Sequence, residues 1–291
     1  MDTKEPLKLS ILVPTIGRKK EVGELLQSIV DCFFDFSYEI IIIDQNGSNL
    51  LDEIISVFQH QLPINHHKVE FRGLSKAKNY GAKIASGAFI SFPDDDCLIF
   101  KDTYSKAFEE INTHNLDLVF GKCIDKEGKD SVLNFNNEAY FLNKNNMIGG
   151  FVEATVVCKK EVFDDFQFDE NMGAGTFFGA EEGFDWVYRL LTTSKHKIYY
   201  TPKIKFYHPQ VILDKGDLTS LNRVFKYRCG TAYLCVKHGF NFTYYKRLIL
   251  TKIATFLFLL KNKNVAEYYR VEAMALQIGK IFAKKLNHVQ K

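Results

Sequence analysis

The sequence has little that would build a small secreted or zinc-bound protein. Its six cysteines are scattered, with no Cys-x-x-Cys pair and no regular spacing, which argues against a disulfide framework and against a cysteine-rich zinc site. The N-terminal stretch lacks the basic start and apolar run of a secretory signal. We therefore expect a chain that works in the reducing cytosol, and its 46% hydrophobic residues exclude a disordered protein.

The C-terminal region also lacks an apolar run of the roughly 20 residues that span a bilayer. Its uninterrupted apolar part covers only residues 253–260, with Thr255 inside it and Lys252 just before it. Residues 244–263 instead mix apolar and aromatic side chains with Lys and Arg, which fits a helix lying in the headgroup region of an anionic leaflet. A helix packed on the catalytic domain or on a second subunit fits the same composition.

Charge is divided unevenly along the chain. Residues 216–291 carry 14 Lys and Arg against three acids, a balance of +11, and residues 1–215 carry −8. This split predicts an acidic catalytic domain over residues 1–215 and a basic helical extension over residues 216–291 that meets something anionic, with the membrane favoured over a packed helix. The basic part has no recognised nucleic-acid-binding motif, and the acidic part would repel phosphate backbones, so we expect no nucleic-acid partner.

The first hundred residues alternate between short apolar runs and helical periodicity. Helical spacing of apolar residues predicts helices over residues 21–30, 50–58 and 74–85. Strands are expected over residues 9–13, 39–43, 68–71 and 88–92. This alternation predicts an α/β fold with a mostly parallel sheet flanked by helices, in which ligands bind outside the carboxyl ends of the strands.

Polar residues follow each expected strand, at the edge where ligands bind. They are Thr15 and Arg18 after the first, Asp44, Gln45 and Asn46 after the second, and Arg72 after the third. Asp94, Asp95 and Asp96 follow the fourth strand. Adjacent carboxylates repel one another, and a hard cation such as Mg²⁺ or Mn²⁺, which binds carboxylates and substrate phosphates, would relieve that repulsion. The triplet thus predicts a metal and nucleotide-phosphate site, with a solvated acidic turn as the alternative.

Five motifs in series resemble the GT-A glycosyltransferases of family 2. They are ILVPT, IIIIDQNGSN, GLSKAKNYGAKIASG, FPDDDC, and GAEEGFDWVYRLL followed by IYYTPKIKFYHP, running in the family's order from about Leu9 to His208. Two of the motifs depart from the family's pattern. The second has Asp-Gln-Asn in place of the commoner double Asp, and the segment from Ala180 to Asp185 lacks the usual Glu-Asp pair.

The resemblance implies a GT-A catalytic domain with a C-terminal α-helical extension. It also implies a divalent cation, Mn²⁺ or Mg²⁺, and a nucleotide-sugar donor, with a UDP-sugar expected. Transfer would invert the anomeric configuration and deliver the sugar to a glycan or polyprenyl-linked acceptor in bacterial surface glycan synthesis. The protein would work in the cytoplasm, or peripherally on the inner face of the plasma membrane.

For the metal, the resemblance implies Asp96 as a direct ligand. Asp94 and Asp95 would reach the metal or the ribose hydroxyls. His208 follows a strand-like run over residues 203–207, and the family implies that it completes the metal shell or contacts the diphosphate. Without the family pattern, a histidine there would be read as a hydrogen-bonded structural residue.

For the nucleotide, Asp44 would accept a hydrogen bond from the imide N–H of the base, and Thr15 would bond the base edge. As the alternative, Asp44 only caps the turn that follows it. Lys78, with the neighbouring Asn79, matches the family's basic-Asn pair near the nucleotide, although a helical lysine is commonly just solvated. The expected nucleotide-sugar-binding residues are Pro14, Thr15, Arg18, Asp44, Asn46, Lys78, Asn79, Asp94 and Asp95.

For catalysis, one carboxylate must remove the proton of the acceptor hydroxyl. Glu181, Glu182 and Asp185 lie at the start of a helix expected over residues 181–191, after a glycine-rich loop over residues 173–179. Counted back from Asp185 and Arg189, Glu182 matches the family's first acid. The alternative is that these acids only favour the helix dipole.

Two other functions remain open from the sequence. A sugar nucleotidyltransferase also uses acids and a metal on an α/β sheet, but it carries a glycine-rich basic loop after its first strand. Residues 14–20, PTIGRKK, supply a single glycine there. A catalytically inactive, nucleotide-binding scaffold of the same fold is the second alternative, and the altered Glu-Glu-Gly-Phe-Asp segment supports it.

Overall fold

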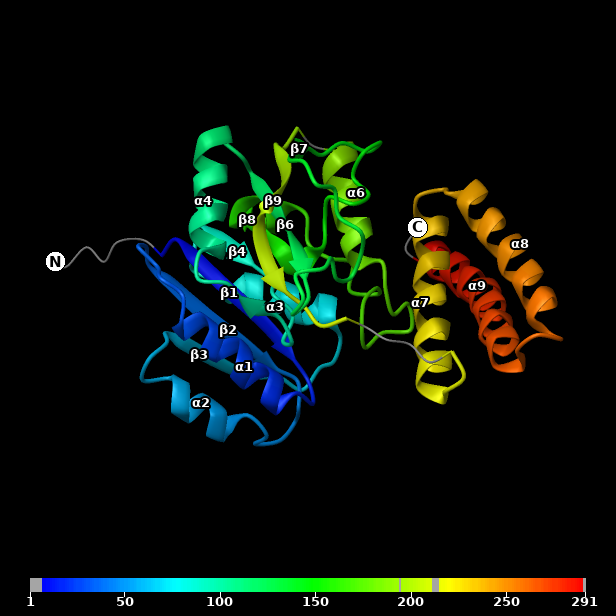
Figure 1. Cartoon of the computed structure of the whole chain (residues 1–291), viewed down its shortest axis with the longest axis horizontal. Helices are drawn as coiled ribbons and strands as arrows, with labels where there is room; N and C mark the ends of the chain where they lie inside the picture. The colour runs from blue at the N-terminus through cyan, green and yellow to red at the C-terminus, as the bar shows by residue number, and fades with distance from the viewer. Residues whose placement is uncertain (1–6, 194, 211–214, 290–291) are drawn as a thin grey trace. The chain divides into compact units, whose positions relative to one another are not determined.

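A computed structural model describes residues 7–193, 195–210 and 215–289. The described residues form two compact units (Figure 1). The first comprises residues 7–72, 76–167 and 186–210, and the second comprises residues 73–75, 168–185 and 215–289. By packing, the segment 168–185 therefore belongs with the C-terminal helices. The functional division at residue 215 stays a prediction.

The first unit is built on a mixed sheet with the strand order β3-β2-β1-β4-β8-β6-β9-β5. The strands before the acidic triplet are parallel to one another: β1 Leu9–Thr15, β2 Tyr38–Asp44, β3 Ile64–Lys68 and β4 Phe89–Ser91. The remaining strands are β5 Leu98–Ile99, β6 Leu118–Ile124, β7 Tyr140–Phe141, β8 Val156–Lys159 and β9 Ile198–Tyr207. Of these, β8 runs antiparallel to β4 and β6, and β9 runs parallel to β6.

The predicted α/β class and mostly parallel sheet are confirmed, but the prediction for the third strand was wrong. It occupies Ile64–Lys68 and not residues 68–71. Among the described strands, this one pairs with β2 alone and lies at the sheet edge, where its side chains are half-buried or exposed. Its sequence, INHHK, therefore lacks the apolar run by which a buried strand is recognised.

Helices cover both faces of the parallel strands. Those with residues in the first unit are α1 Lys19–Val30, α2 Asp52–Phe58, α3 Leu74–Ile84, α4 Thr103–His114, α5 Lys160–Asp165 and α6 Glu182–Thr193. Ile40 and Ile42 of β2 pack in one core cluster with the apolar faces of α1, α2 and α4. On the other face, Ile43 lies so close to α3 that a Cβ at Gly81 would be 2.9 Å from its Cδ1. Burial of alternate side chains on both faces explains the unbroken isoleucine run of β2.

The second unit contains three long helices, α7 Leu218–Lys237, α8 Asn241–Phe258 and α9 Lys263–Val289. They confirm the predicted helical extension. α7 and α9 approach so closely that a Cβ at Gly279 would lie 2.7 Å from Cα of Cys229. Arg247 of α8 makes an ion pair with Glu272 of α9 at 2.8 Å. Within the described part of the chain, no helix has the length and apolar character needed to cross a membrane.

Candidate active site

The acidic triplet lies in a turn between β4 and β5. The backbone N–H of Cys97 donates to the carbonyl oxygen of Asp94 at 3.0 Å and closes the turn. β5 then pairs antiparallel with the end of β9, which places Leu98 opposite Tyr207. The next residue, His208, is thereby brought beside the turn. Strand pairing, and not proximity in sequence, assembles this part of the site.

Asp94, Asp96 and His208 form a cluster that could hold a cation. Their ligand atoms all lie within 4.8 Å of one another, and Nε2 of His208 is 3.7 Å from a carboxylate oxygen of each aspartate. Nδ1 of His208 lies 2.8 Å from the carbonyl oxygen of Pro209, which can only accept a hydrogen bond. In the neutral ring, Nδ1 therefore carries the proton and Nε2 presents its lone pair to the cluster. The two carboxylates supply the oxygen ligands that Mn²⁺ and Mg²⁺ prefer, so these residues fit the predicted cation.

Arg18 pairs with the other side of the triplet. Its guanidinium lies 2.9 Å from Asp95 and also makes an ion pair with Asp96. Although partial burial acts to lower it, the neighbouring Asp95 and Asp96 carboxylates raise the pKa of Arg18. Burial raises the pKa of Asp95 to about 6, with Arg18 and Thr15 opposing the rise. Pairing with Arg18 is thus too weak to offset the burial of this carboxylate, as expected for a half-exposed arginine.

Lys78 is fully buried in α3, which contradicts the alternative of a solvated helical lysine. Its Nζ lies 3.8 Å from the carboxylate of Glu153, in the short 3₁₀ helix Glu153–Thr155. Burial raises the pKa of Asp94, and the positive charge of Lys78 opposes that rise. Lys78 therefore lies within electrostatic reach of the candidate cation site. Neighbouring Asn79 is also buried, and the nucleotide roles of both residues stay predictions.

Asp44 does cap the turn after β2. Its Oδ1 accepts hydrogen bonds from the backbone N–H and the side-chain amide of Asn46, at 2.9 Å and 2.6 Å. Its Oδ2 lies 3.0 Å from Nε2 of His66 in β3. Thr15 is the register partner of Asp44 in β1, so both residues end neighbouring strands, with Pro14 buried beside them. These contacts order the strand ends, and contact with a base stays a prediction.

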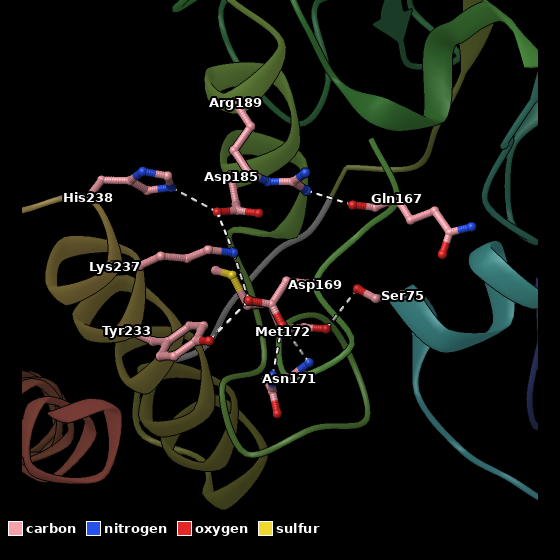
Figure 2. Close-up of polar contacts among 10 residues, drawn as sticks. All are labelled: Ser75, Gln167, Asp169, Asn171, Met172, Asp185, Arg189, Tyr233, Lys237 and His238. Atoms are coloured by element: carbon pink, nitrogen blue, oxygen red, sulfur yellow. Dashed lines mark hydrogen bonds and ion pairs between the residues drawn. The ribbon is translucent and has the colours of Figure 1, made fainter. Parts of the chain in front are cut away.

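The three candidate catalytic acids lie in the second unit, and Figure 2 shows one of them, Asp185, with its partners. The hydroxyl of Thr231 donates to the Glu181 carboxylate at 2.8 Å. Asp185 is completely buried and lies 2.8 Å from both Lys237 and His238. Glu182 begins α6, and its carboxylate packs against Gly173, where a Cβ would lie 3.1 Å from Cδ of Glu182. Gly173 also has φ +98°, so both its backbone and its lack of a side chain suit this contact.

Several residues around the predicted ones had no sequence signal of their own. Glu153 belongs to none of the five motifs, and His66 lies in the strand that the apolar pattern missed. Thr231 and Lys237 lie in helix α7, more than 40 residues after the acids that they contact. Their contacts depend on long-range packing, which no local pattern encodes. Gln45 and Arg72 lie at or after strand ends as expected, but Arg72 follows β3 by four residues.

Fold and acidic turn together define a GT-A type glycosyltransferase. The sequence model of glycosyl transferase family 2 matches residues 10–167, more than half of the chain. The chain therefore belongs to this family. The match includes the acidic triplet, Arg18 and Lys78, and it ends before Glu181, Glu182, Asp185 and His208. The roles of all these residues, inside and outside the match, remain predictions.

Curated relatives are bacterial transferases longer than the region they share with this chain. "Poly(ribitol-phosphate) beta-N-acetylglucosaminyltransferase TarS" of Staphylococcus aureus (strain Mu50) is 28% identical over 126 residues, 42% of this chain and 22% of TarS. "GalNAc(5)-diNAcBac-PP-undecaprenol beta-1,3-glucosyltransferase" of Campylobacter jejuni is 29% identical over 209 residues, 67% of this chain and 62% of that enzyme. In both cases the match spans less than two thirds of the relative.

Solved structures share the fold over nearly the whole chain. TarS 1-349 from S. aureus in complex with UDP-GlcNAc has a TM-score of 0.61 and 19% identity, covering 96% of this chain and 92% of that one. A mannosyltransferase from Pyrobaculum calidifontis in complex with GDP-Man and Mn²⁺ has a TM-score of 0.55 and 14% identity, covering 99% and 77%. At these identities the likeness establishes the GT-A fold only.

Proposed function

We propose that the protein transfers one sugar from a UDP-sugar to a glycan or polyprenyl-linked acceptor in bacterial surface glycan synthesis. The observation that carries this proposal is the cluster of Asp94, Asp96 and His208 beyond the carboxyl end of β4, with Arg18 beside it. The relatives support the donor and acceptor classes, because one TarS structure holds UDP-GlcNAc and the Campylobacter enzyme is named for an undecaprenyl diphosphate-linked acceptor. The reaction would take place in the cytoplasm.

Residues of the first unit would bind the donor. Asp94, Asp96 and His208 would hold a divalent cation, which when bound offsets the charge that grows on the leaving diphosphate. Arg18, already paired with the triplet, is a bidentate donor suited to a phosphate oxygen. The ends of β1 and β2 would receive the base at Thr15 and Asp44.

Residues of the second unit would act on the acceptor. Glu182 would take the proton of the acceptor hydroxyl while the oxygen attacks the anomeric carbon, and the bond to the diphosphate breaks with its electron pair leaving on the diphosphate. Counted back from Asp185 and Arg189, Glu182 matches the family's first acid, which favours it as the base.

Helix α8 supports a peripheral contact with an anionic membrane. Its buried residues are only Tyr244 and Thr251. Phe242, Ile249, Ile253 and Phe256 recur at helical spacing and are 49–80% exposed. Lys246 and Lys252 border this apolar stripe on its two sides, an arrangement that lets the ammonium groups reach headgroups while the apolar side chains enter the leaflet.

A panel of nucleotide sugars tests the reaction. UDP-, GDP- and dTDP-sugars are scored for binding with and without Mn²⁺, and for slow hydrolysis. We expect metal-dependent binding of a UDP-sugar and release of UDP. Release of pyrophosphate from UTP and a sugar phosphate would instead establish a nucleotidyltransferase, and binding without any turnover on glycan or polyprenyl acceptors would favour the inactive scaffold.

A further inference from the structure

Lys237 of α7 joins the two ends of the segment that carries the candidate base. This segment, residues 168–185, has Asp169 at its beginning and Asp185 at its end. Nζ of Lys237 lies 2.7 Å from Oδ2 of Asp169 and 2.8 Å from Oδ1 of Asp185 (Figure 2). A single ammonium group therefore bridges two carboxylates that are 16 residues apart in the sequence.

Neighbouring groups complete the contacts of both carboxylates. Nε2 of His238 lies 2.8 Å from Asp185, and the hydroxyl of Tyr233 donates to Asp169 at 3.0 Å. Asp185 is fully buried, and the side chain of Asp169 is 14% exposed. Burial acts to raise the pKa of Asp169, but Lys237 and Asn171 more than offset it and the pKa is lowered. The bridge is therefore strong enough to keep a largely buried carboxylate charged.

Between its two ends, the segment has a backbone that needs such support. Gly173 and Gly175 have φ values of +98° and +90°, and Glu181 has a φ of +74°. Residues other than glycine rarely adopt such a backbone conformation. The segment also has anchors between its ends: Ser75 donates to the carbonyl of Met172 at 2.7 Å, the N–H of Leu74 to the carbonyl of Ala174 at 2.9 Å, and the N–H of Gly179 to the carbonyl of Lys226 at 3.1 Å. Met172 and Phe178, which flank these glycines, are buried in a core cluster of the second unit, so the bridge at the two ends adds to packing along the stretch.

We propose that Lys237 is a positioning residue for the transfer reaction, acting through Glu182. Asp185 lies three residues after Glu182 on the same helix, one turn further and on the same face. By fixing Asp185 and Asp169 to α7, Lys237 sets where α6 begins and hence where the Glu182 carboxylate points. This inference rests on the proposed function of Glu182 as the base.

The test is a double-mutant cycle between Lys237 and Glu182. Lys237→Met keeps the length and apolar stem of the side chain and removes the charge. We expect a fall in kcat of tenfold or more on a soluble acceptor, with the KM for the donor unchanged, and partial recovery in Lys237→Arg. In the Glu182→Gln background, the same substitution should have almost no further effect, because the group that it positions is already absent. Lys284→Met, an exposed lysine of α9, is the matched control and should leave kcat unchanged.

Equal losses from Lys237→Met in both backgrounds would overturn the proposal, since they would mean a general loss of folded protein. If Lys237→Met does not fold, the same cycle is measured with Lys237→Arg and Asp169→Asn, which perturb the structure less. Equal losses of kcat in the two backgrounds would again overturn the proposal. If the unchanged chain transfers no sugar from any donor in the panel, the proposed function itself is wrong. The two failures are distinguishable because the cycle is scored only on a chain with measured turnover.

Discussion

The hydroxyl of Thr231 in α7 donates a hydrogen bond to the carboxylate of Glu181 at 2.8 Å. The backbone of Glu181 has a φ of +74°. A left-handed conformation at a glutamate is strained, and the bond to α7 helps to hold it. Glu181 thus has a structural role next to Glu182, which begins α6. This contact gives Glu181 a role of its own, apart from the match of Glu182 to the family's first acid.

We predict that Glu182→Gln lowers kcat by about a hundredfold or more while the Kd for the donor stays nearly unchanged, the scale of losing a general base. Glu181→Gln should lower kcat less and lower the Tm instead, because it weakens the contact with Thr231. Steady-state kinetics and donor titrations of both variants measure this. If Glu181→Gln has the larger effect on kcat, Glu181 is the base. If neither matters, Asp185 or the inactive scaffold gains support.

Asp96→Ala should abolish transfer and metal-dependent nucleotide binding while leaving the fold intact. Removing one acid relieves repulsion within the triplet, and the lost ion pair with the half-exposed Arg18 stabilises the fold little. The two effects oppose each other, so we expect a Tm close to that of the unchanged chain. Asp164→Ala, an exposed acid of α5, is the matched control. Unchanged turnover of Asp96→Ala in Mn²⁺ or Mg²⁺ would rule out Asp96 as a ligand.

The fold was predictable where burial leaves a simple pattern. Ile40 and Ile43 point to opposite faces of a sheet covered by helices, so their run identified a buried parallel strand. β3 was misplaced because it is an edge strand, and its two histidines break the apolar pattern. For Lys78 the sequence left solvent exposure open as the alternative to a nucleotide contact, because single-residue tendencies carry no information about packing, and only the fold places it beside Glu153.

The candidate site was predictable only in part, for the same reason. The three aspartates of the acidic triplet are adjacent in the sequence, so the repulsion among their carboxylates can be predicted from the sequence alone. His208 entered through the family resemblance, and the β5–β9 pairing that brings it to the triplet has no local signal. Lys237 and Thr231 lie in α7, far along the sequence from the acids that they contact. Neither periodicity nor spacing identifies such a partner. Contacts of this kind require the tertiary structure.

Acid should weaken the second unit through Asp169. Because the folded-state pKa of this carboxyl is lowered, its ion pair stabilises the fold above the unfolded-state pKa of about 3.9, and that stability is lost as the pH falls through the folded-state value. We expect the free energy of unfolding to drop as the pH falls below about 4, and to drop less in Asp169→Asn. Urea unfolding at several pH values measures it. The same slope in both proteins would show that this carboxyl does not contribute.

The last prediction concerns the membrane contact of α8. Each basic residue near an anionic surface contributes about 1 kcal/mol, screened within a Debye length of about 8 Å. Arg247 belongs to the basic cluster of residues 244–263, but its guanidinium is bound to Glu272. It should therefore contribute little. The lysines expected to contact headgroups are Lys246, Lys252, Lys261 and Lys263.

Changing these four lysines together to Gln should release the protein from liposomes that contain anionic lipid, and raised salt should do the same to the unchanged chain. Turnover on a soluble acceptor should stay normal in both. The matched control changes four exposed lysines of the first unit to Gln, Lys83, Lys101, Lys126 and Lys144, and should leave sedimentation with liposomes nearly unaltered. If the unchanged chain ignores anionic liposomes at low salt, the exposed Phe242, Ile249, Ile253 and Phe256 instead pack against a second subunit, and sedimentation equilibrium would then give a dimer or larger species.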